Sequence, residues 1–335
     1  MRRWLARNAN RSTQKARVHH AHQRRCCAAA CRARTAAGKI AARRRVGVRV
    51  AAVSVRRRLP ARAGYYAEGK NITVEFLYTD VRGDRAAELA AEFVRAGVDV
   101  IVAHFTPAVR AAMAATRTIP IVMAPAGAPL QQGLIDSLSR PGGNVTGLSA
   151  MDAEFGGKQL QLLRELIPNL ACVGILAATP ATDSGFGEVF AEDLRTAAVK
   201  AGLRLVPVLV DGPNAFERAF EAMSNGGAQA VVVQELFGPH RAILVDLANK
   251  YHLALMGTSQ ETTAAGALIS MSINYSVFYE RAAFYVDKIL KGAKPADLPV
   301  EQPTIFQATL NMKTVRALGL TPTPTLLAQI DEIIE

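Results

Sequence analysis

The sequence predicts an α/β protein made of two doubly wound lobes, in which helices cover both faces of a parallel sheet. Short apolar runs alternate with amphipathic stretches of about 10–15 residues, which is the pattern of successive βαβ units. The 335 residues suffice for two domains of about 150 residues each. A Pro- and Gly-rich interruption at residues 138–157 (LSRPGGNVTGLSAMDAEFGG) divides the alternation into two runs.

The first run predicts three strands and three helices. The strands are expected at residues 72–78, 98–103 and 119–124, and the helices at 84–96, 106–117 and 130–139. The second and third strands are almost wholly apolar, as in a parallel sheet that is buried on both faces. Thr106 and Pro107 suit the N-cap and the first position of the helix that they open.

The interruption predicts the passage from one lobe to the other. Its Arg-Pro-Gly-Gly segment at 140–143 cannot continue a helix, because proline lacks the backbone N–H and glycine is costly there. Residues 144–148 (NVTGL) are typical of a short strand. Ligands of open α/β sheets bind at the carboxyl ends of strands, so this passage also predicts a cleft.

The second run repeats the pattern and then continues beyond it. Helices are expected at 158–167, 187–201, 214–224 and 240–251, and strands at 172–177, 203–210, 228–234 and 253–256. A second passage between the lobes is expected at 258–261. Farther on we expect a strand at 266–273, a helix at 275–290, a linker at 295–299, a strand at 305–310, a short helix at 313–318 and a final helix.

The net charge of +12 comes from one segment only. Residues 1–64 contain 19 Lys and Arg and no Asp or Glu, whereas the rest of the chain has 21 basic and 28 acidic residues. An acidic body does not resemble a nucleic-acid-binding domain. Three interpretations of the basic segment stay open: a nucleic-acid-binding arm, an organellar transit peptide, or GC-rich DNA translated in the wrong frame. We favour the third, because Arg, Ala, Cys and His dominate the segment.

The sequence offers no metal site and no catalytic constellation. Cys26, Cys27 and Cys31 lack zinc-finger spacing, and Cys172 precedes an apolar run as a small hydrophobic residue. A nucleophile elbow, a Walker loop and an H-E-x-x-H motif are all missing. We therefore expect neither an enzyme nor a cofactor. No run of about 18 apolar residues predicts a transmembrane helix.

Six stretches of the body carry a resemblance to a known family. They are AEGKNITVEF (67–76), SLSRPGGNVTGLSA (137–150), LQLLRELIPN (160–169), GALISMS (266–272), YVDKILKGAKPADLPVEQPT (285–304) and LNMKTVRALGL (310–320). In combination they make residues 65–335 resemble the ABC-transporter substrate-binding proteins of the TrpX-like family. Those proteins have a type I periplasmic-binding-protein fold, in which a hinge with several crossings joins two lobes.

The resemblance also defines what we expect of each lobe. We assign residues 65–147 and 259–294 to the first lobe, and residues 148–258 and 295–335 to the second. Family members have the first strand and helix of lobe 1 where this chain has its basic segment, residues 1–64. We therefore expect that strand and helix to be missing and the segment to be disordered or out of frame. A first lobe without its central strand would be poorly stable.

Loops at strand ends and the first turns of helices supply the candidate ligand-binding residues, since free N–H groups at helix starts attract a carboxylate. The candidates are Thr106, Ala126, Ser149, Met151, Phe155, Thr179, Asp183, Glu235, Phe237, Gln260, Glu261 and Met271. Glu235 could pair with a ligand amine and Phe237 could pack on the ligand's side chain, whereas Thr106 and Asp183 could also be plain helix caps. Met271 stands where the family pattern has a tyrosine, so an aromatic role there is not expected.

These observations favour a solute-binding component of an ABC uptake transporter, which closes its hinge on a small ligand and performs no chemistry. The apolar candidates favour a hydrophobic or aromatic amino-acid-like ligand. We expect an inner-membrane ABC permease as partner, no nucleic acid, a monomer, and a periplasmic location although no signal peptide is recognisable. The alternative is the ligand-sensing domain of a repressor-like protein with a basic DNA-binding arm. Against it, residues 1–64 lack the apolar periodicity of a helix-turn-helix.

Overall fold

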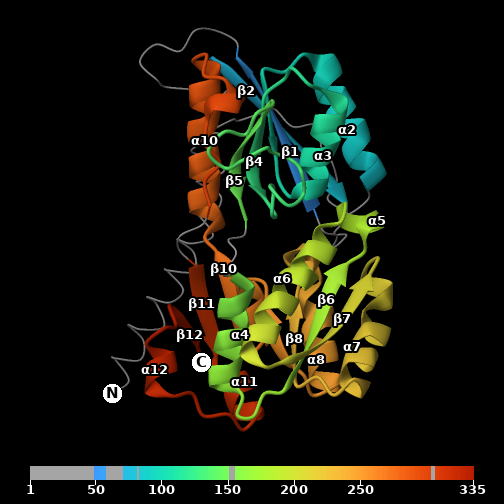
Figure 1. Ribbon diagram of the computed structural model, residues 1–335, viewed down its shortest axis with the longest axis vertical. Coiled ribbons are helices and arrows are strands. Elements are labelled where there is room, and N and C mark those ends of the chain that lie inside the picture. The colour runs from blue at the N-terminus through green and yellow to red at the C-terminus, as the bar shows by residue number, and fades with distance from the viewer. Residues whose placement is uncertain (1–48, 58–70, 81–82, 151–154, 303–305) are drawn as a thin grey trace, which may run out of the picture.

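The computed structural model describes residues 49–57, 71–80, 83–150, 155–302 and 306–335, and they form two lobes stacked along the long axis (Figure 1). Each lobe is built on one sheet. The first sheet has five strands in the order β2-β1-β3-β4-β5, and the second has seven in the order β12-β11-β10-β9-β8-β6-β7. The prediction of a two-lobed α/β protein is confirmed.

The first lobe has helices on both faces of its sheet. Its strands are β1 (Arg49–Arg57), β2 (Ile72–Asp80), β3 (Val100–Ala103), β4 (Ile121–Ala126) and β5 (Val145–Ser149), and its helices are α2 (Gly83–Ala96), α3 (Thr106–Ala115) and α10 (Tyr275–Leu290). Figure 1 shows α2 and α3 on one side of this sheet and α10 on the other. Alternate residues of β4 follow this division: Ile121 and Met123 pack under α2 and α3, whereas Val122 packs under α10.

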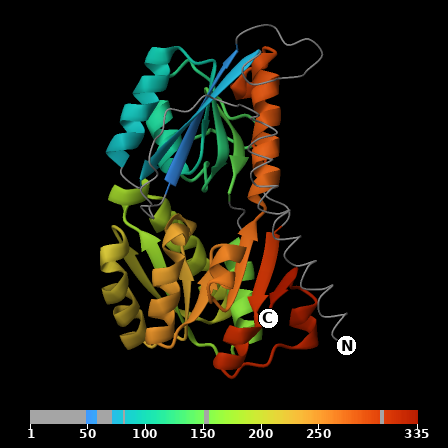
Figure 2. The same cartoon turned by 180° about the vertical axis from the view of Figure 1, so that it is seen from behind.

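The expectation that lobe 1 lacks its first strand is wrong. β1 lies inside the sheet, second from its edge, and pairs with β2 on one side and β3 on the other (Figure 2). Both pairings are antiparallel, whereas β3, β4 and β5 run parallel to one another. Residues 1–48 and 58–70, where a first helix was expected to be missing, lie outside the described residues.

The second lobe repeats the arrangement with a larger sheet. Its strands are β6 (Cys172–Ala178), β7 (Arg204–Val210), β8 (Ala230–Val233), β9 (Ala254–Gly257), β10 (Ile269–Ile273), β11 (Phe306–Asn311) and β12 (Glu332–Ile334). The helices are α4 (Phe155–Leu166), α5 (Pro180–Asp183), α6 (Phe186–Ala201), α7 (Phe216–Asn225), α8 (Arg241–Lys250), α9 (Gln260–Ala264), α11 (Met312–Ala317) and α12 (Pro324–Leu327), with 3-10 turns η1 (Pro213–Ala215) and η2 (Glu235–His240). Residues of α4 and α6 cover one face of the sheet, and residues of α7 and α8 cover the other.

Two local predictions differ from the structure. Residues 130–139 form turns rather than a helix. Ala128 and Gly133 have φ angles of 42° and 63°, in the left-handed region that a right-handed helix excludes. The expected final helix is the short α12, after which β12 adds a parallel edge strand to β11.

The lobe boundaries also differ from those assigned on the sequence. The prediction of a passage between the lobes at 258–261 is wrong, because α9 and β10 stay in the second lobe, where β10 pairs with β9 and β11. The chain enters the first lobe between β10 and α10. It then runs along β5 through η3 (Pro295–Asp297) to Glu301, whose backbone bonds Gly147 and Ser149. Residues 295–301 therefore belong with the first lobe, and the chain re-enters the second at β11.

Candidate functional site

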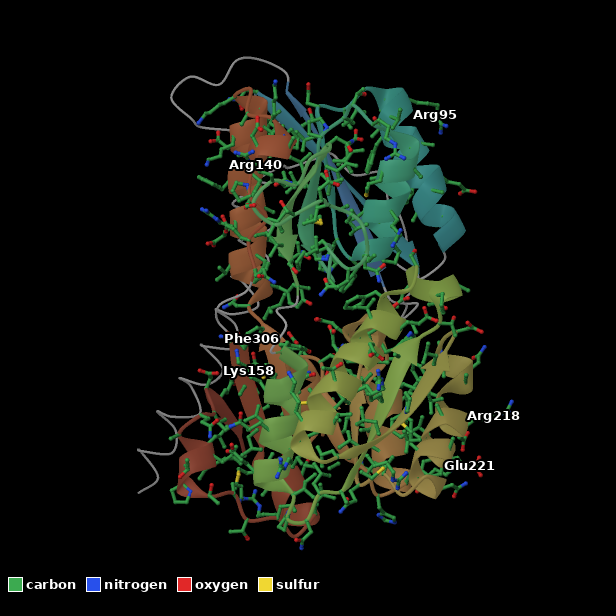
Figure 3. The ribbon with its side chains drawn as sticks, in the orientation of Figure 1. Arg95, Arg140, Lys158, Arg218, Glu221 and Phe306 are labelled. Carbon is green, nitrogen blue, oxygen red and sulfur yellow. The ribbon has the colours of Figure 1, made fainter. Side chains whose placement is uncertain are left out.

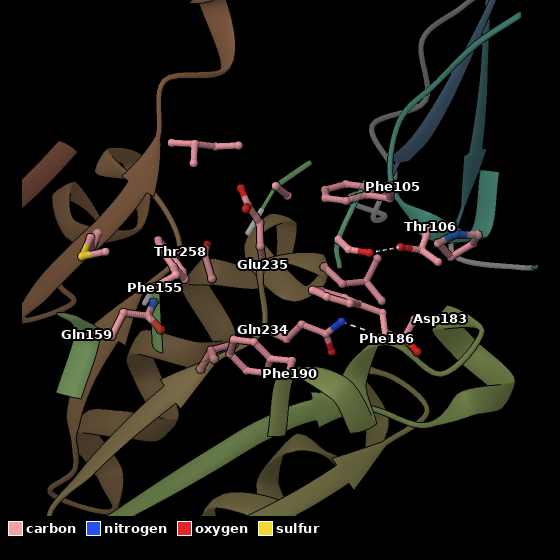
Figure 4. A pocket seen from close by; sticks show the side chains of 17 residues that line it. Phe105, Thr106, Phe155, Gln159, Asp183, Phe186, Phe190, Gln234, Glu235 and Thr258 are labelled. Atoms are coloured by element: carbon pink, nitrogen blue, oxygen red, sulfur yellow. Dashed lines mark hydrogen bonds between the residues drawn. The ribbon is translucent and has the colours of Figure 1, made fainter. Parts of the chain in front are cut away.

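A cavity lies between the two lobes, lined by residues from both (Figure 4). The first lobe contributes Phe105 and Thr106 after β3 and Gly127 after β4. In the second lobe, Glu235 follows β8 and Thr258 follows β9. Each of these residues follows the carboxyl end of a strand, which is the position that parallel α/β sheets give to their ligands.

Aromatic rings form much of the wall. Phe105, Phe155, Phe186 and Phe190 all line the cavity. Phe186 and Phe190 lie one turn apart on α6, with ring centroids 6.4 Å apart. Phe155, at the start of α4, packs on Phe306 with a centroid distance of 5.0 Å. Rings held from several sides form an apolar slot that suits a flat hydrophobic group.

The Phe155 ring is fixed from the hinge side. The Phe306 ring that supports it also has the ammonium group of Lys158 5.0 Å from its centroid (Figure 3). Phe105, on the opposite lobe, has a φ of 64° and a ψ of 155°, a combination with positive φ that is strained for a residue with a large side chain. Its ring is packed against His104, with centroids 3.9 Å apart.

Asp183 is buried and fully engaged by its own lobe. Its carboxylate accepts hydrogen bonds from the Gln234 side chain at 2.6 Å and from the Gly185 amide at 3.1 Å. The amides of Phe186 and Gly187 also bond it, so it caps the first turn of α6. Burial raises the pKa of Asp183, and these hydrogen bonds oppose the rise.

Glu235 is the acidic group that faces the cavity without such a network. Burial raises its pKa to about 7, the hydroxyl of Tyr275 lowers it in part, and the charge of Glu261 raises it further. The Tyr275 hydroxyl is itself buried and makes no hydrogen bond of standard geometry. Tyr275 is the first residue of α10, so this pair spans the junction between the lobes.

His104 lies behind the cavity wall rather than in it. Its Nδ1 bonds the backbone carbonyl of Ala124, and the Tyr279 hydroxyl lies 3.4 Å from the same nitrogen. Burial lowers the pKa of His104 to about 4. The imidazole is therefore neutral near pH 7 and holds the β3–α3 loop in place.

The lobes touch at two further points beside the cavity. The Gln132 side chain of the first lobe donates to the Gly185 carbonyl of the second at 3.2 Å. The Phe186 ring lies directly on the backbone of Gly127, where a methyl group in place of the glycine hydrogen would stand 2.3 Å from the ring. Gly127 is thus a close-approach position between the lobes.

The structure brings five of the twelve candidate residues to the cavity wall: Thr106, Phe155, Asp183, Glu235 and Met271. Thr106 is the first residue of α3 rather than its N-cap, which is Phe105, and its hydroxyl donates to the Gly127 carbonyl at 3.3 Å. Ala126 and Ser149 are buried one residue before Gly127 and Ala150, which do line the cavity. Met151 lies outside the described residues.

The remaining four candidates lie apart from the cavity wall. Phe237 is buried in the α7–α8 core, with its ring 4.9 Å from that of Phe216. The Thr179 hydroxyl bonds Asp211, and Gln260 bonds Glu332 at 2.7 Å. Glu261 is exposed and reaches the site only through its charge on Glu235.

Sequence reasoning missed several wall residues: Phe105, Gln159, Phe186, Phe190 and Gln234. Gly127 and Thr258 lie in loops that the sequence places at strand ends, although neither was itself chosen as a candidate. A signal existed for Gln159, which stands four residues after the candidate Phe155 on the same helix and therefore shares a face with it. Phe190 stands in the same relation to Phe186, but Phe186 was not among the candidates.

The chemistry of the wall is apolar and acidic. Among the described residues that line the cavity there is no Lys, Arg or His. Within the described ranges no cluster of three or more His, Cys, Asp or Glu side chains is placed to hold a metal ion. Nor does any helix in that part of the chain have the length and apolar character needed to span a bilayer.

A comparison with protein families matches residues 61–334 to the model of the ABC transporter substrate-binding proteins. This chain belongs to that family. It is therefore a solute-binding component of an ABC transporter that binds a small molecule, not an enzyme. The repressor-like alternative considered from the sequence does not describe this family.

The names of two relatives of this substrate-binding protein specify an amino acid. The tyrosine-binding protein of Clostridioides difficile (strain R20291) is 26% identical over 256 residues, which cover 76% of this chain and 73% of the relative. An ABC domain from Streptococcus pneumonia, solved in complex with L-Trp, is 26% identical with a TM-score of 0.70 and covers 75% and 84% of the two chains. A conserved domain protein from Vibrio cholerae is 25% identical with a TM-score of 0.70 over 75% and 83%.

Proposed function

We propose that this substrate-binding protein takes up an aromatic L-amino acid and holds it in the cavity between its lobes. The observation that carries the proposal is the pairing of four phenylalanine rings with one carboxyl group, Glu235, that its own lobe leaves uncommitted. Two relatives with names or ligands that specify tyrosine and L-Trp support the same ligand class.

The polar ends of such a ligand have complementary partners. Glu235 would pair with the α-ammonium group, since an ionised carboxyl prefers a cation in a poorly hydrated site. Asp183 is an unsuitable partner, because three backbone amides and Gln234 already use its oxygens. The ligand carboxylate would meet the first turn of α3, where the N-cap Phe105 supplies no side-chain hydrogen bond.

We further propose that binding closes the hinge and that the protein delivers its ligand to an ABC permease in the inner membrane. It would act in the periplasm as a monomer and without nucleic acid. Support comes from the family itself and from the three chain passages that join the lobes. Cell fractionation, light scattering on the purified protein and co-purification with the permease test these points separately.

Titration calorimetry of the purified full chain against the common amino acids and simple sugars tests the ligand class. We expect tyrosine, tryptophan or phenylalanine to bind most tightly. Phe186→Ala should weaken that binding, whereas Val199→Ala, at a position on α6 that is 70% exposed, should leave it unchanged. Binding of a sugar or an aliphatic amino acid in preference to every aromatic one would overturn the proposal.

A further inference from the structure

Gln159 places a polar amide group in a buried position. It is only 3% exposed, it lies on α4 one turn after Phe155, and it lines the cavity. Its Oε1 is buried and has no hydrogen-bond partner in the described structure. Buried amide oxygens are nearly always hydrogen-bonded, so one that is not requires an explanation.

The neighbouring side chains do not supply that partner. Leu160 and Leu163 follow Gln159 on α4, and Met271 of β10 lines the cavity together with it; all three belong to the apolar core of this lobe. A Leu or Met at position 159 would pack there without leaving a polar group unpaired. The amide is therefore better explained by a group that enters the cavity than by the packing of the lobe.

The other amide and hydroxyl side chains of the wall are engaged elsewhere. The Thr106 hydroxyl donates to the Gly127 carbonyl, and the Gln234 amide donates to Asp183. The Thr258 hydroxyl lies 3.3 Å from that of Thr262. None of these groups donates a hydrogen bond to Gln159, so its Oε1 can accept one from a donor group of the ligand.

The position of Gln159 indicates which part of the ligand it meets. Figure 4 shows it on the opposite side of the pocket from Thr106 and Asp183. If the ammonium and carboxylate groups lie at Glu235 and the start of α3, the aromatic side chain runs toward Phe155, and its far end meets Gln159. This step rests on the proposed function, because it assumes an aromatic amino acid in that orientation.

We propose that Gln159 is a specificity-determining residue, whose Oε1 accepts a hydrogen bond from a donor at the far end of the ligand's aromatic side chain. The phenol O–H of tyrosine and the indole N–H of tryptophan are such donors, and phenylalanine has none. Phenylalanine would leave the buried oxygen unpaired and displace any water from it. A site built around such a hydrogen bond rejects the analogue that lacks the donor, here by about tenfold or more.

Calorimetric Kd values for tyrosine, tryptophan, phenylalanine and 1-methyltryptophan test the proposal on the unmodified protein. The methyl group replaces the indole donor, so 1-methyltryptophan should bind at least about tenfold more weakly than tryptophan. The variant Gln159→Met keeps the size of the side chain and removes the amide. It should bind phenylalanine at least as well as the unmodified protein does and should lose the preference for tyrosine and tryptophan.

Gln161→Met is the matched control, because Gln161 is exposed on the same helix and bonds Glu165 rather than facing the cavity. It should leave all four Kd values unchanged. Equal affinity for phenylalanine, tyrosine and tryptophan would overturn the role of Gln159 while the proposed function stands. Failure of every aromatic amino acid to bind would overturn the proposed function as well. The methylated ligand keeps the test decisive even if the Gln159 variant folds poorly.

Discussion

A single methyl group at position 127 should hold the two lobes apart. Gly127 belongs to the first lobe and Phe186 to the second, and a Cβ at position 127 would lie 2.3 Å from the Phe186 ring. The backbone of Gly127 is outside the left-handed region, so alanine fits the loop itself. The clash therefore falls on closure rather than on the folding of either lobe.

The size of the effect follows from the cost of overpacking. Forcing one extra methyl group into a close contact costs about 1–3 kcal/mol. Because each 1.4 kcal/mol is tenfold in affinity, Gly127→Ala should weaken ligand binding about 5- to 150-fold. The ring could escape the methyl group only by turning into the cavity, where it would occupy the ligand's space, so either response weakens binding.

Calorimetry measures the loss of affinity, and small-angle scattering with and without ligand measures closure. Gly143→Ala is the matched control, since a Cβ there meets nothing within 4 Å. In the background of Phe186→Ala the methyl group has room, so Gly127→Ala should then cost little more. Unchanged affinity together with unchanged scattering in Gly127→Ala would show that the contact between Gly127 and Phe186 does not limit closure.

Three further outcomes are expected from buried groups. Burial raises the pKa of Glu235 to about 7. The affinity for an amino acid should therefore increase as the pH rises through 7, because the carboxyl group ionises and can pair with the ammonium group of the ligand. In titrations on both sides of pH 7, the variant Glu235→Gln should show a smaller increase. Burial lowers the pKa of His104 to about 4 from an ordinary value near 6.5, so as the pH falls the unfolded chain takes up a proton before the folded one does. The stability of the protein should therefore decrease between about pH 6.5 and pH 4. Thermal melting of His104→Asn should show a smaller decrease over this range. Phe220 is fully buried in the second lobe, so Phe220→Ala should cost about 3–5 kcal/mol in chemical denaturation, whereas Val199→Ala, on the surface, should stay within about 0.5 kcal/mol.

Each of these outcomes has a result that would contradict it. An equal pH slope of affinity in Glu235→Gln and the unmodified protein would remove Glu235 from the ligand's ammonium group. Identical acid profiles with and without His104 would show that other groups dominate the acid response. A Phe220→Ala protein as stable as the Val199→Ala protein would mean that the α7 core is not packed as described.

The regular elements were predictable where one physical signal dominated. α10 spans residues 275–290 as its amphipathic pattern predicts, and β6 begins at Cys172 because an apolar run starts there. The turns at 130–139 escaped prediction, since the composition suits a helix whereas the backbone at Gly133 has a left-handed φ that a helix excludes. β1 was hidden by its basic flanks, although the run VAAVSV within it is typical of a strand.

The candidate site was predictable to within about one residue wherever strand ends build it. Ala126 and Ser149 were predicted, but Gly127 and Ala150 line the cavity, because successive residues of an extended chain face opposite sides. Phe237 shows the same limit, since nothing in its local sequence says whether it faces the ligand or the α7–α8 core. The helix residues of the wall depend on how α4 and α6 are rotated, which only tertiary packing decides.

The three passages between the lobes have a mechanical consequence. They connect β5 with α4, β10 with α10, and the segment after η3 with β11, and in both Figures 1 and 2 the described elements that they join meet on the side of the molecule away from α5. Connecting segments that lie along one edge resist twisting and sliding of the lobes against each other. Bending about that edge is therefore the easiest relative motion of the two lobes. The distance between two probes, one attached to each lobe at the opposite edge near α5, would then report the whole movement from the open to the closed state.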